Sequence, residues 1–247
     1  MVMSDERVDW RMTVLVPAAG DSTRMGGPVR KPWMQLAGQP ILLHTLRAIR
    51  AWPGVDEVIV LVHPEDLENA RGPAGRVLME AGATLVAAGG ASRNESVWAG
   101  LEILDPSTDL VAVHDAVRPF LGSETAGLLA RTAWERGAAV PMLPTVDTVK
   151  RIEVDQVTET VRRHGLVRIQ TPQVFRLDLL LDAHEAVRAT GGYQRHHTDD
   201  ASLVEAAGEP VSVVMGEPWN LKITTREDLR LAEALIGAGL VTVPGDG

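Results

Sequence analysis

A loop that could bind phosphate follows the first apolar run of this 247-residue sequence. Residues 16–31 read VPAAGDSTRMGGPVRK, so that small residues are followed by two cations, Arg24 and Lys31. The backbone N–H groups of residues 18–20 carry little side-chain bulk beside them and can surround an anion. The two cations can close on a polyphosphate from two sides. A solvated surface turn has the same composition, so the loop alone leaves both interpretations open.

The elements that must position this loop alternate between strands and helices. The patterns of buried strands cover residues 13–16, 57–62, 84–88, 110–114, 138–143 and 211–215. Helical patterns cover residues 41–52, a segment that ends near residue 79, and residues 92–104, 123–136, 177–189, 201–207 and 225–236. This order predicts an α/β fold, in which a mostly parallel, twisted sheet has helices on both faces. Ligands of such sheets bind at the carboxyl ends of the strands, where the loop lies.

The alternation stops at Pro144. Residues 145–170 are polar and β-branched without a helical stripe, which predicts an extended β-arm or hairpin. Its β-branched apolar residues are Val146, Val149, Ile152, Val154, Val157, Val161, Val167 and Ile169. On an isolated chain these side chains would form an exposed edge unless a partner covers them. Because the sequence contains no repeat, we expect one domain over residues 1–247, with this arm and a frayed tail at 241–247.

The composition excludes several classes of protein. A net charge of −9 argues against nucleic acid or an anionic membrane as the main partner, but not against a small anionic ligand. The sequence contains no cysteine, which rules out disulfides and thiolate chemistry and suits a reducing compartment. The first residues are acidic where a signal peptide needs cations, and no apolar stretch approaches the ~20 residues of a membrane span. We therefore expect a soluble, cytoplasmic protein.

Several polar residues have a structural interpretation. His114 ends a predicted strand, and we expect it to orient the following turn rather than to act as a base. The adjacent side chains of His196 and His197 diverge and have no third ligand at a spacing that would hold a metal. Asp199 and Asp200 stand at a predicted helix start, where the helix dipole stabilises at least one of them.

Seven segments together resemble the 2-C-methyl-D-erythritol 4-phosphate cytidylyltransferase family, in family order, over residues 14 to about 235. They are PAAG-x-x-x-R-M with a following Lys (17–31), GG-x-x-R-x-x-S-V (89–97), HDA-x-RP (114–119), D-T-x-K (147–150), TPQ-x-F (171–175), TDDAS (198–202) and N-x-K-I-T (220–224). The resemblance implies a Rossmann-like nucleotidyltransferase domain. The implied reaction joins CTP to 2-C-methyl-D-erythritol 4-phosphate and releases pyrophosphate, in the non-mevalonate pathway to isoprenoids.

The resemblance also implies roles for individual residues. The implied catalytic residues are Arg24, Lys31 and Lys222. The implied nucleotide-binding residues are Pro17, Ala18, Ala19, Gly20, Arg24, Lys31, Gly89, Gly90 and Ser96. The implied sugar-phosphate residues are Asp115, Ala116, Arg118, Thr148, Arg163, Thr171, Thr198 and Lys222. Asp115 is the implied Mg²⁺ ligand, and the arm residues Thr148 and Arg163 are implied to reach the site of a second subunit, in a homodimer with exchanged arms.

Two positions depart from the family pattern, and two other functions stay open. Pro32-Trp33 stands where the family often has Gln followed by an aromatic residue, and Ala91 stands where it often has Asp. A cytidylyltransferase for another polyol phosphate, such as ribitol 5-phosphate, would need similar cations. A non-catalytic nucleotide-binding regulatory protein is a further alternative, although the joint presence of Arg24, Lys31 and Asp115 weighs against it.

Overall fold

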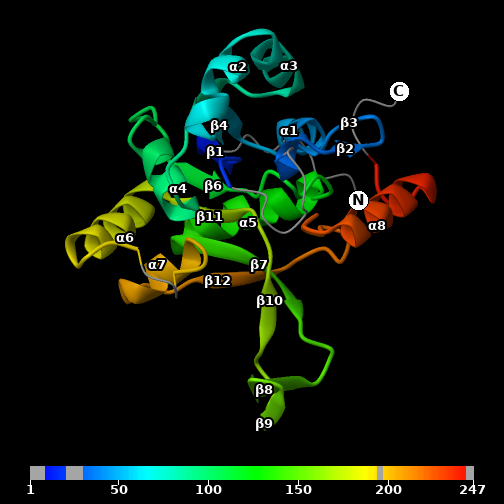
Figure 1. The fold of residues 1–247 in the computed structure, drawn as a ribbon. Coiled ribbons are helices and arrows are strands. Elements are labelled where there is room, and N and C mark those ends of the chain that lie inside the picture. Colours follow the sequence, from blue (N-terminus) through cyan, green and yellow to red (C-terminus); the bar gives the residue numbers. More distant parts are fainter. Residues whose placement is uncertain (1–8, 21–29, 194–196, 243–247) are drawn as a thin grey trace.

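Eight strands form the central sheet of the computed structural model, which describes residues 9–20, 30–193 and 197–242 (Figure 1). The strands are β1 (Met12–Pro17), β4 (Val55–Val62), β5 (Leu85–Ala88), β6 (Leu110–Val113), β7 (Ala138–Pro144), β10 (Val167–Ile169), β11 (Gln173–Arg176) and β12 (Ser212–Met215). Their order is β10-β7-β11-β6-β1-β4-β5, and β12 pairs with β7. Two small hairpins stand outside this sheet: β2 (Gln35–Leu36) with β3 (Gln39–Pro40), and β8 (Val149–Glu153) with β9 (Gln156–Val161).

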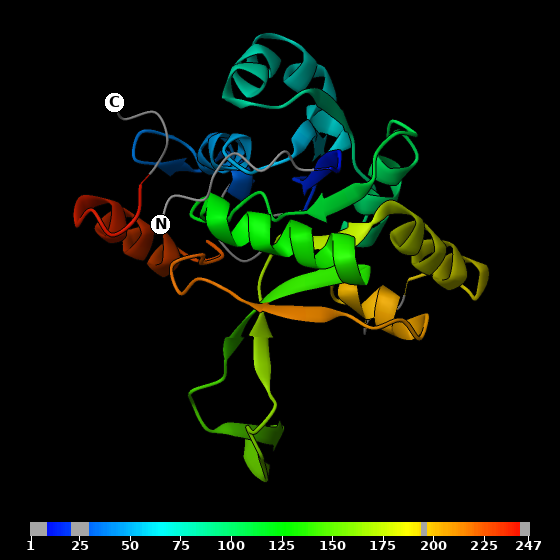
Figure 2. The same ribbon diagram turned by 180° about the vertical axis from the view of Figure 1, so that it is seen from behind.

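Helices cover both faces of the sheet (Figures 1 and 2). They are α1 (Ile41–Arg50), α2 (Leu67–Arg71), α3 (Pro73–Ala81), α4 (Arg93–Leu101), α5 (Ser123–Arg136), α6 (Leu177–Ala189), α7 (Ala201–Ala206) and α8 (Arg226–Gly237). Two short 3₁₀ helices, η1 (Lys31–Trp33) and η2 (Pro64–Asp66), follow β1 and β4. The structure therefore confirms the predicted α/β fold with a mostly parallel sheet.

Strand β11 is the part of the sheet that the sequence pattern did not predict. It is antiparallel to both of its neighbours, β6 and β7, whereas β1 is parallel to β4 and to β6. Its sequence, QVFR, has two apolar residues between polar ones directly before a helix, so it lacks the apolar run that marked the other buried strands. Because β11 runs in the opposite direction, its first residue, Gln173, pairs with Val113 at the end of β6. The segment that precedes β11 therefore joins the carboxyl edge of the parallel strands.

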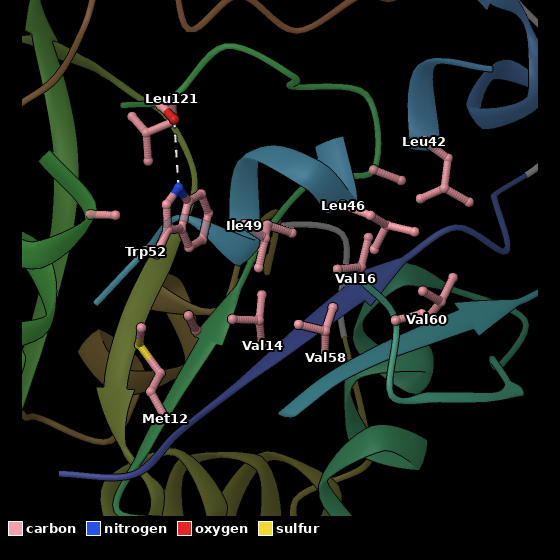
Figure 3. Close-up of a cluster of buried hydrophobic side chains, with 14 of the residues drawn as sticks. Met12, Val14, Val16, Leu42, Leu46, Ile49, Trp52, Val58, Val60 and Leu121 are labelled. Atoms are coloured by element: carbon pink, nitrogen blue, oxygen red, sulfur yellow. Dashed lines mark hydrogen bonds between the residues drawn. The ribbon is translucent and has the colours of Figure 1, made fainter. Parts of the chain in front are cut away.

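The sheet separates two large layers of the core, as the alternation along β1 shows, and a third, smaller cluster includes Val117 and Ile223. Val14 and Val16 pack with α1 on one face, whereas Leu15 packs with α4 and α6 on the other. Figure 3 shows the first layer, where the indole N–H of Trp52 donates to the carbonyl oxygen of Leu121 at 3.5 Å. Burying one aliphatic side chain of the size of Val14 or Leu15 stabilises the fold by about 1.5–3 kcal/mol. The parallel strands are thus buried on both faces and hold their carboxyl ends in one plane.

The hairpin β8–β9 extends away from the body of the molecule (Figures 1 and 2). Ile152, Val154 and Val157 are exposed, Val154 at its tip by 99%, whereas Val149 and Val161 are half-buried. After the hairpin, β10 returns to the body and pairs antiparallel with β7, so that the arm begins and ends at one point of the sheet. In a single chain the arm therefore presents apolar side chains to solvent.

Two histidines are completely buried, His114 after β6 and His184 in α6. Burial lowers the pKa of each imidazole to about 4. His114 Nε2 lies 2.9 Å from the carbonyl oxygen of Arg118, and His184 Nδ1 lies 2.7 Å from the hydroxyl of Tyr193. Both rings are therefore neutral at pH 7, and each has a polar partner.

We expect the free energy of unfolding to fall as the pH drops from 7 towards 4. In the unfolded chain a histidine has a pKa of about 6.5, above the folded values, so the unfolded state binds the protons first. At pH 5 the loss should be about 2 kcal/mol per histidine. Urea unfolding at several pH values measures it. Replacing His184 with Asn should remove about half of the pH dependence of the unfolding free energy. An unchanged pH dependence in that variant would contradict the lowered pKa of buried His184.

Candidate active site

Several of the segments that the resemblance assigns to the site meet at the carboxyl edge of the sheet. Residues 17–20 lie at the end of β1, residues 89–96 follow β5 and residues 114–118 follow β6. The antiparallel direction of β11 brings Thr171 to the same edge. Arg24 lies outside the described residues, as do His196 and residues 243–247 of the predicted tail.

Small residues let the ends of β1 and β5 approach α4 closely. The backbone N–H of Ala18 donates to the carbonyl of Leu61 at 2.8 Å, which holds the end of β1 against β4. A Cβ atom on Gly89 would lie 2.8 Å from the Cβ of Ala19 and 2.8 Å from the hydroxyl of Ser96. Only glycine fits at this position. The predicted nucleotide-binding residues on β1, β5 and α4 are therefore brought together.

The hydroxyl of Ser96 binds backbone in this structure. It donates to the carbonyl of Ser92 at 2.8 Å and accepts from the N–H of Gly90 at 3.0 Å. Its side chain is buried. Ser96 therefore shapes the turn at Gly90, and a direct contact of its hydroxyl with a nucleotide stays a prediction.

The turn that carries Lys31 is anchored on both sides. Arg30, which precedes it, forms ion pairs with Asp66 at 2.7 Å and Glu65 at 3.1 Å. Pro32 is buried in η1, and Trp33 packs against the core layer that contains α1. The Pro-Trp pair that departs from the family pattern thus forms part of a packed turn.

The Asp115 carboxylate is shared by three cations. Its Oδ2 lies 3.0 Å from Nε of Arg118 and 3.1 Å from Nζ of Lys222, and its Oδ1 lies 3.9 Å from Nε of Arg93. Burial alone would raise the pKa of this carboxyl, but the charges of Lys222, Arg93 and Arg118 hold the pKa well below its usual range. Arg93 also pairs with the buried Asp200 at 2.7 Å. These ion pairs join three cations to two carboxylates, which favours an incoming anion.

A ring of hydrogen bonds holds the Asp115 turn. The Asp115 N–H donates to Thr171 Oγ1 at 3.0 Å, and Thr171 Oγ1 lies 3.2 Å from Nδ1 of His114. His114 Nε2 faces the carbonyl of Arg118, which can only accept, so the neutral ring carries its proton on Nε2 and accepts from Thr171 at Nδ1. The Arg118 Nε–H closes the ring on Asp115. His114 therefore orients the turn, as the sequence predicted.

The neighbouring Ala116 is held by its backbone. Its carbonyl accepts from the hydroxyl of Thr45 in α1 at 3.0 Å, and its side chain is buried. Ala116 can therefore offer the ligand little side-chain surface.

Lys222 stands between two buried anchors. The side-chain Nδ2 of Asn220 donates to the backbone carbonyl of Thr171 at 2.9 Å. The backbone carbonyl of Asn220 accepts from Nη1 of Arg118 at 2.7 Å. On the other side, the N–H of the buried Ile223 donates to the carbonyl of Val117 at 3.0 Å. Lys222 is thus fixed beside the Asp115 turn, although about half of its side chain is exposed.

Thr198 lies at the same edge and is exposed, before the start of α7. Asp199 Oδ1 accepts from the N–H of Ser202 at 3.1 Å, so this carboxylate stabilises the helix start as predicted. Asp200 instead forms the buried ion pair with Arg93.

The arm residues Thr148 and Arg163 are exposed and flank the β8–β9 hairpin. The guanidinium of Arg163 donates to the carbonyl of Val146. Within the described residues, neither side chain forms a hydrogen bond or ion pair with the Asp115 cluster. The fold of a single chain does not bring them to the site.

Three residues of the site were not predicted from the sequence. Arg93 and Asn220 hold fixed positions in the segments GG-x-x-R-x-x-S-V and N-x-K-I-T, which is a signal that could have identified them. Gln170, whose amide nitrogen donates to the carbonyl of Asn220 at 3.0 Å, has no comparable signal.

In the described part of the chain, no group of three or more His, Asp or Glu side chains is placed to hold a metal ion. Asp115 therefore stands as one carboxylate among cations.

No described helix is long and apolar enough to cross a membrane.

Known proteins share both the sequence and the fold. The family model IspD, 2-C-methyl-D-erythritol 4-phosphate cytidylyltransferase, matches residues 12–238. A protein of that name from Solibacter usitatus is 43% identical over 243 residues, which cover 92% of this chain and 96% of the relative. One from Geotalea uraniireducens is 41% identical over 231 residues, covering 92% and 97%.

Two solved structures are similar over nearly the whole chain. The 2-C-methyl-D-erythritol 4-phosphate cytidylyltransferase of Thermus thermophilus superposes with a TM-score of 0.75 at 37% identity, covering 91% of this chain and 98% of that one. The 4-diphosphocytidyl-2C-methyl-D-erythritol synthase of Anaerococcus prevotii gives a TM-score of 0.78 at 30% identity, covering 92% and 96%. With the extent of the family match, these likenesses show that the chain belongs to the 2-C-methyl-D-erythritol 4-phosphate cytidylyltransferase family.

Proposed function

We propose that this chain is a cytoplasmic enzyme that condenses CTP with 2-C-methyl-D-erythritol 4-phosphate. The products are 4-diphosphocytidyl-2-C-methyl-D-erythritol and pyrophosphate, in the synthesis of isoprenoid precursors. The observation that carries the proposal is the surplus of cations around Asp115, beside a turn lined by backbone and small residues at the same edge of the sheet. Membership of the family supports it.

The chemical step needs position and charge rather than a base. A phosphate oxygen of the sugar phosphate attacks the α-phosphorus of CTP in line, and pyrophosphate leaves. The attacking phosphate monoester is already an anion near neutral pH. His114, which lies directly beside Asp115, uses both ring nitrogens inside the turn and is neutral at pH 7. His114 is therefore a structural residue in this mechanism.

The difficulty is to bring two anions together. We assign Arg24 and Lys31 to the triphosphate, and Arg118 and Lys222 to the sugar phosphate. Because Arg118 and Lys222 are held within 3.1 Å of Asp115 before the ligand arrives, they need little reorganisation to stabilise charge in the transition state. Thr171 and Thr198 lie along the same edge and would complete the sugar-phosphate side.

Asp115 can supply one ligand to Mg²⁺. Mg²⁺ in nucleotide enzymes is commonly held by one or two carboxylates together with substrate phosphates and water. Among the ion pairs of the described residues, Asp115 Oδ1 contacts the more distant Arg93 at 3.9 Å whereas Oδ2 contacts two cations, so Oδ1 would be the oxygen offered to the metal ion. When bound, Mg²⁺ would neutralise charge on the triphosphate.

We propose that backbone groups around Ala18, Ala19 and Gly90 recognise cytosine, while Pro17, Gly20 and Gly89 allow the close approach. Ser96 supports this pocket by holding the N–H of Gly90. Backbone recognition is also compatible with Ala91, whose side chain cannot accept a hydrogen bond.

We propose a homodimer in which the arms exchange. The exposed apolar side chains of the arm, Val154 among them, would be covered by the partner. The exchange would also deliver Thr148 and Arg163 to the sugar-phosphate side of the partner's site.

Release of pyrophosphate tests the function. The enzyme should release it from CTP and 2-C-methyl-D-erythritol 4-phosphate, and CTP should be preferred to UTP. In UTP a carbonyl oxygen replaces the amine of cytosine, so the backbone carbonyls of the pocket would face a second hydrogen-bond acceptor. This loss should weaken transition-state binding of UTP by about 1–3 kcal/mol, or lower kcat/KM roughly 5- to 150-fold. Equal use of both nucleotides would remove the cytosine pocket. Reaction with ribitol 5-phosphate alone would identify a different polyol cytidylyltransferase, and no release with any pair would indicate a binding protein.

Lys31→Ala should lower kcat by about 100- to 1,000-fold and change the KM for CTP far less. A preorganised charge of this kind acts mainly on the transition state. Steady-state kinetics with varied CTP measures both constants, and Arg136→Ala on the exposed end of α5 is the control for a lost surface cation. Turnover within a few-fold of the parent would refute the role of Lys31.

A mixed dimer tests the exchange of arms. One subunit carries Lys31→Ala, the other carries Arg163→Ala, and two affinity tags isolate the heterodimer. If each site uses Arg163 of the partner subunit, one site receives both lesions and the other receives neither, so about half of the parent activity should return. If each site belongs to one chain, both sites stay damaged. Sedimentation that shows a stable monomer at working concentration would contradict the dimer directly.

A further inference from the structure

The start of helix α5 is capped by a carboxylate that lies 95 residues further along the chain. The N-cap residue is Gly122, which has no side chain to supply the usual acceptor. Instead, Glu217 accepts from the N–H of Gly122 at 3.2 and 3.3 Å, and from the hydroxyl of Thr125 at 2.5 Å. The negative charge of Glu217 also suits the N-terminal end of the helix dipole.

Glu217 thereby joins the two segments that form the charged cluster. Residues 114–122 carry Asp115 and Arg118, and residues 216–222 carry Lys222. At one end the segments are linked by the ion pair of Lys222 with Asp115 at 3.1 Å. At the other end they are linked by the bonds of Glu217 to the start of α5. Both ends of the pair of segments are thus fixed.

The backbone at Glu217 follows a constrained path. Its N–H donates to Oε1 of Gln170 at 3.2 Å, and its carbonyl accepts from Nε2 of Gln170 at 2.9 Å. A Cβ atom on Gly216 would lie 2.4 Å from the same Oε1. Gln170 therefore fixes the direction in which the segment leaves the sheet, and the Glu217 side chain then attaches the segment to α5.

The capping of α5 and the attachment of residues 216–222 are separable roles. Gly122 has φ −73° and ψ 153°, the extended backbone of an ordinary N-cap, which any residue can adopt. The atoms that a Cβ on Gly122 would approach, at 3.1–3.8 Å, all belong to the Glu217 side chain. Once that side chain is shortened, an aspartate at position 122 can cap α5 locally, while residues 216–222 stay detached from the helix.

We propose that Glu217 is a positioning residue for the reaction proposed above. Its bonds to the start of α5 hold residues 216–222 so that Lys222 faces Asp115 and Arg118. When the attachment is lost, the contacts of Asn220 and Ile223 still hold the segment on either side of Lys222, but its other end is released and Lys222 becomes less well fixed relative to the Asp115 turn. The effect falls on the sugar-phosphate side and leaves the nucleotide side, at residues 17–20 and 89–96, unchanged.

Two variants separate attachment from capping. Glu217→Ala should lower Tm by a few degrees and raise the KM for the sugar phosphate about tenfold, with the KM for CTP within twofold of the parent. Adding Gly122→Asp to Glu217→Ala should restore Tm but not the KM for the sugar phosphate. Thr125→Val, which removes one bond to the same carboxylate and leaves the bonds to Gly122, should keep near-parent kinetics. Parent kinetics in the double variant would show that Glu217 only caps the helix and would overturn the proposal.

Hydrogen exchange of the free protein tests the attachment without turnover. In the double variant, peptides that cover residues 216–224 should exchange faster than in the parent, while peptides of α5 exchange at the parent rate. Unchanged exchange in residues 216–224 would overturn the attachment. Because this readout needs no substrate, it stays informative even if the parent protein fails to use CTP and 2-C-methyl-D-erythritol 4-phosphate, an outcome that would refute the proposed function alone.

Discussion

The ionised carboxylate of Asp115 is the constraint on which the site depends, because three cations from different parts of the chain share it. Two unit charges 4 Å apart at a protein surface interact by about 4 kcal/mol. Without the carboxylate, the like charges of Arg93, Arg118 and Lys222 would repel one another. The same three charges keep Asp115 ionised despite its burial. The cluster is therefore stable as a unit, and each member relies on the others.

A cluster of this kind is organised before any ligand binds. Arg118 is held at both ends of its guanidinium, by Asp115 and by the carbonyl of Asn220, and Arg93 is held between Asp115 and the buried Asp200. Incoming phosphate meets cations whose positions the core has already determined. The entropy of these long, charged side chains is lost during folding and not when the ligand binds. Charges that are ordered in advance stabilise a transition state most effectively.

Much of this arrangement could be predicted from the sequence, and several of the missed contacts join residues that are far apart in the chain. The bounds of α5 followed from its composition and from Gly137, whose φ of 92° ends the helix. The edge of the site followed from the rule that parallel strands end together. Strand β11 and the roles of Arg93, Gln170, Asn220 and Glu217 did not follow. Asn220 bonds to Thr171, 49 residues away, and Glu217 bonds to Gly122, 95 residues away, and no local pattern records such distances.

The engagement of Arg118 and Lys222 with Asp115 also bears on the exposed arm. A phosphate that enters the site of a single chain must compete with the Asp115 carboxylate for both cations. The ion pairs with Asp115 therefore reduce the attraction of Arg118 and Lys222 for a dianion. A further cation that is not already paired with Asp115 would strengthen the sugar-phosphate side. Arg163 is such a cation, since its guanidinium binds only a backbone carbonyl among the contacts of the described residues. Its place on an arm with exposed apolar side chains gives the proposed exchange of arms an electrostatic reason in addition to the hydrophobic one.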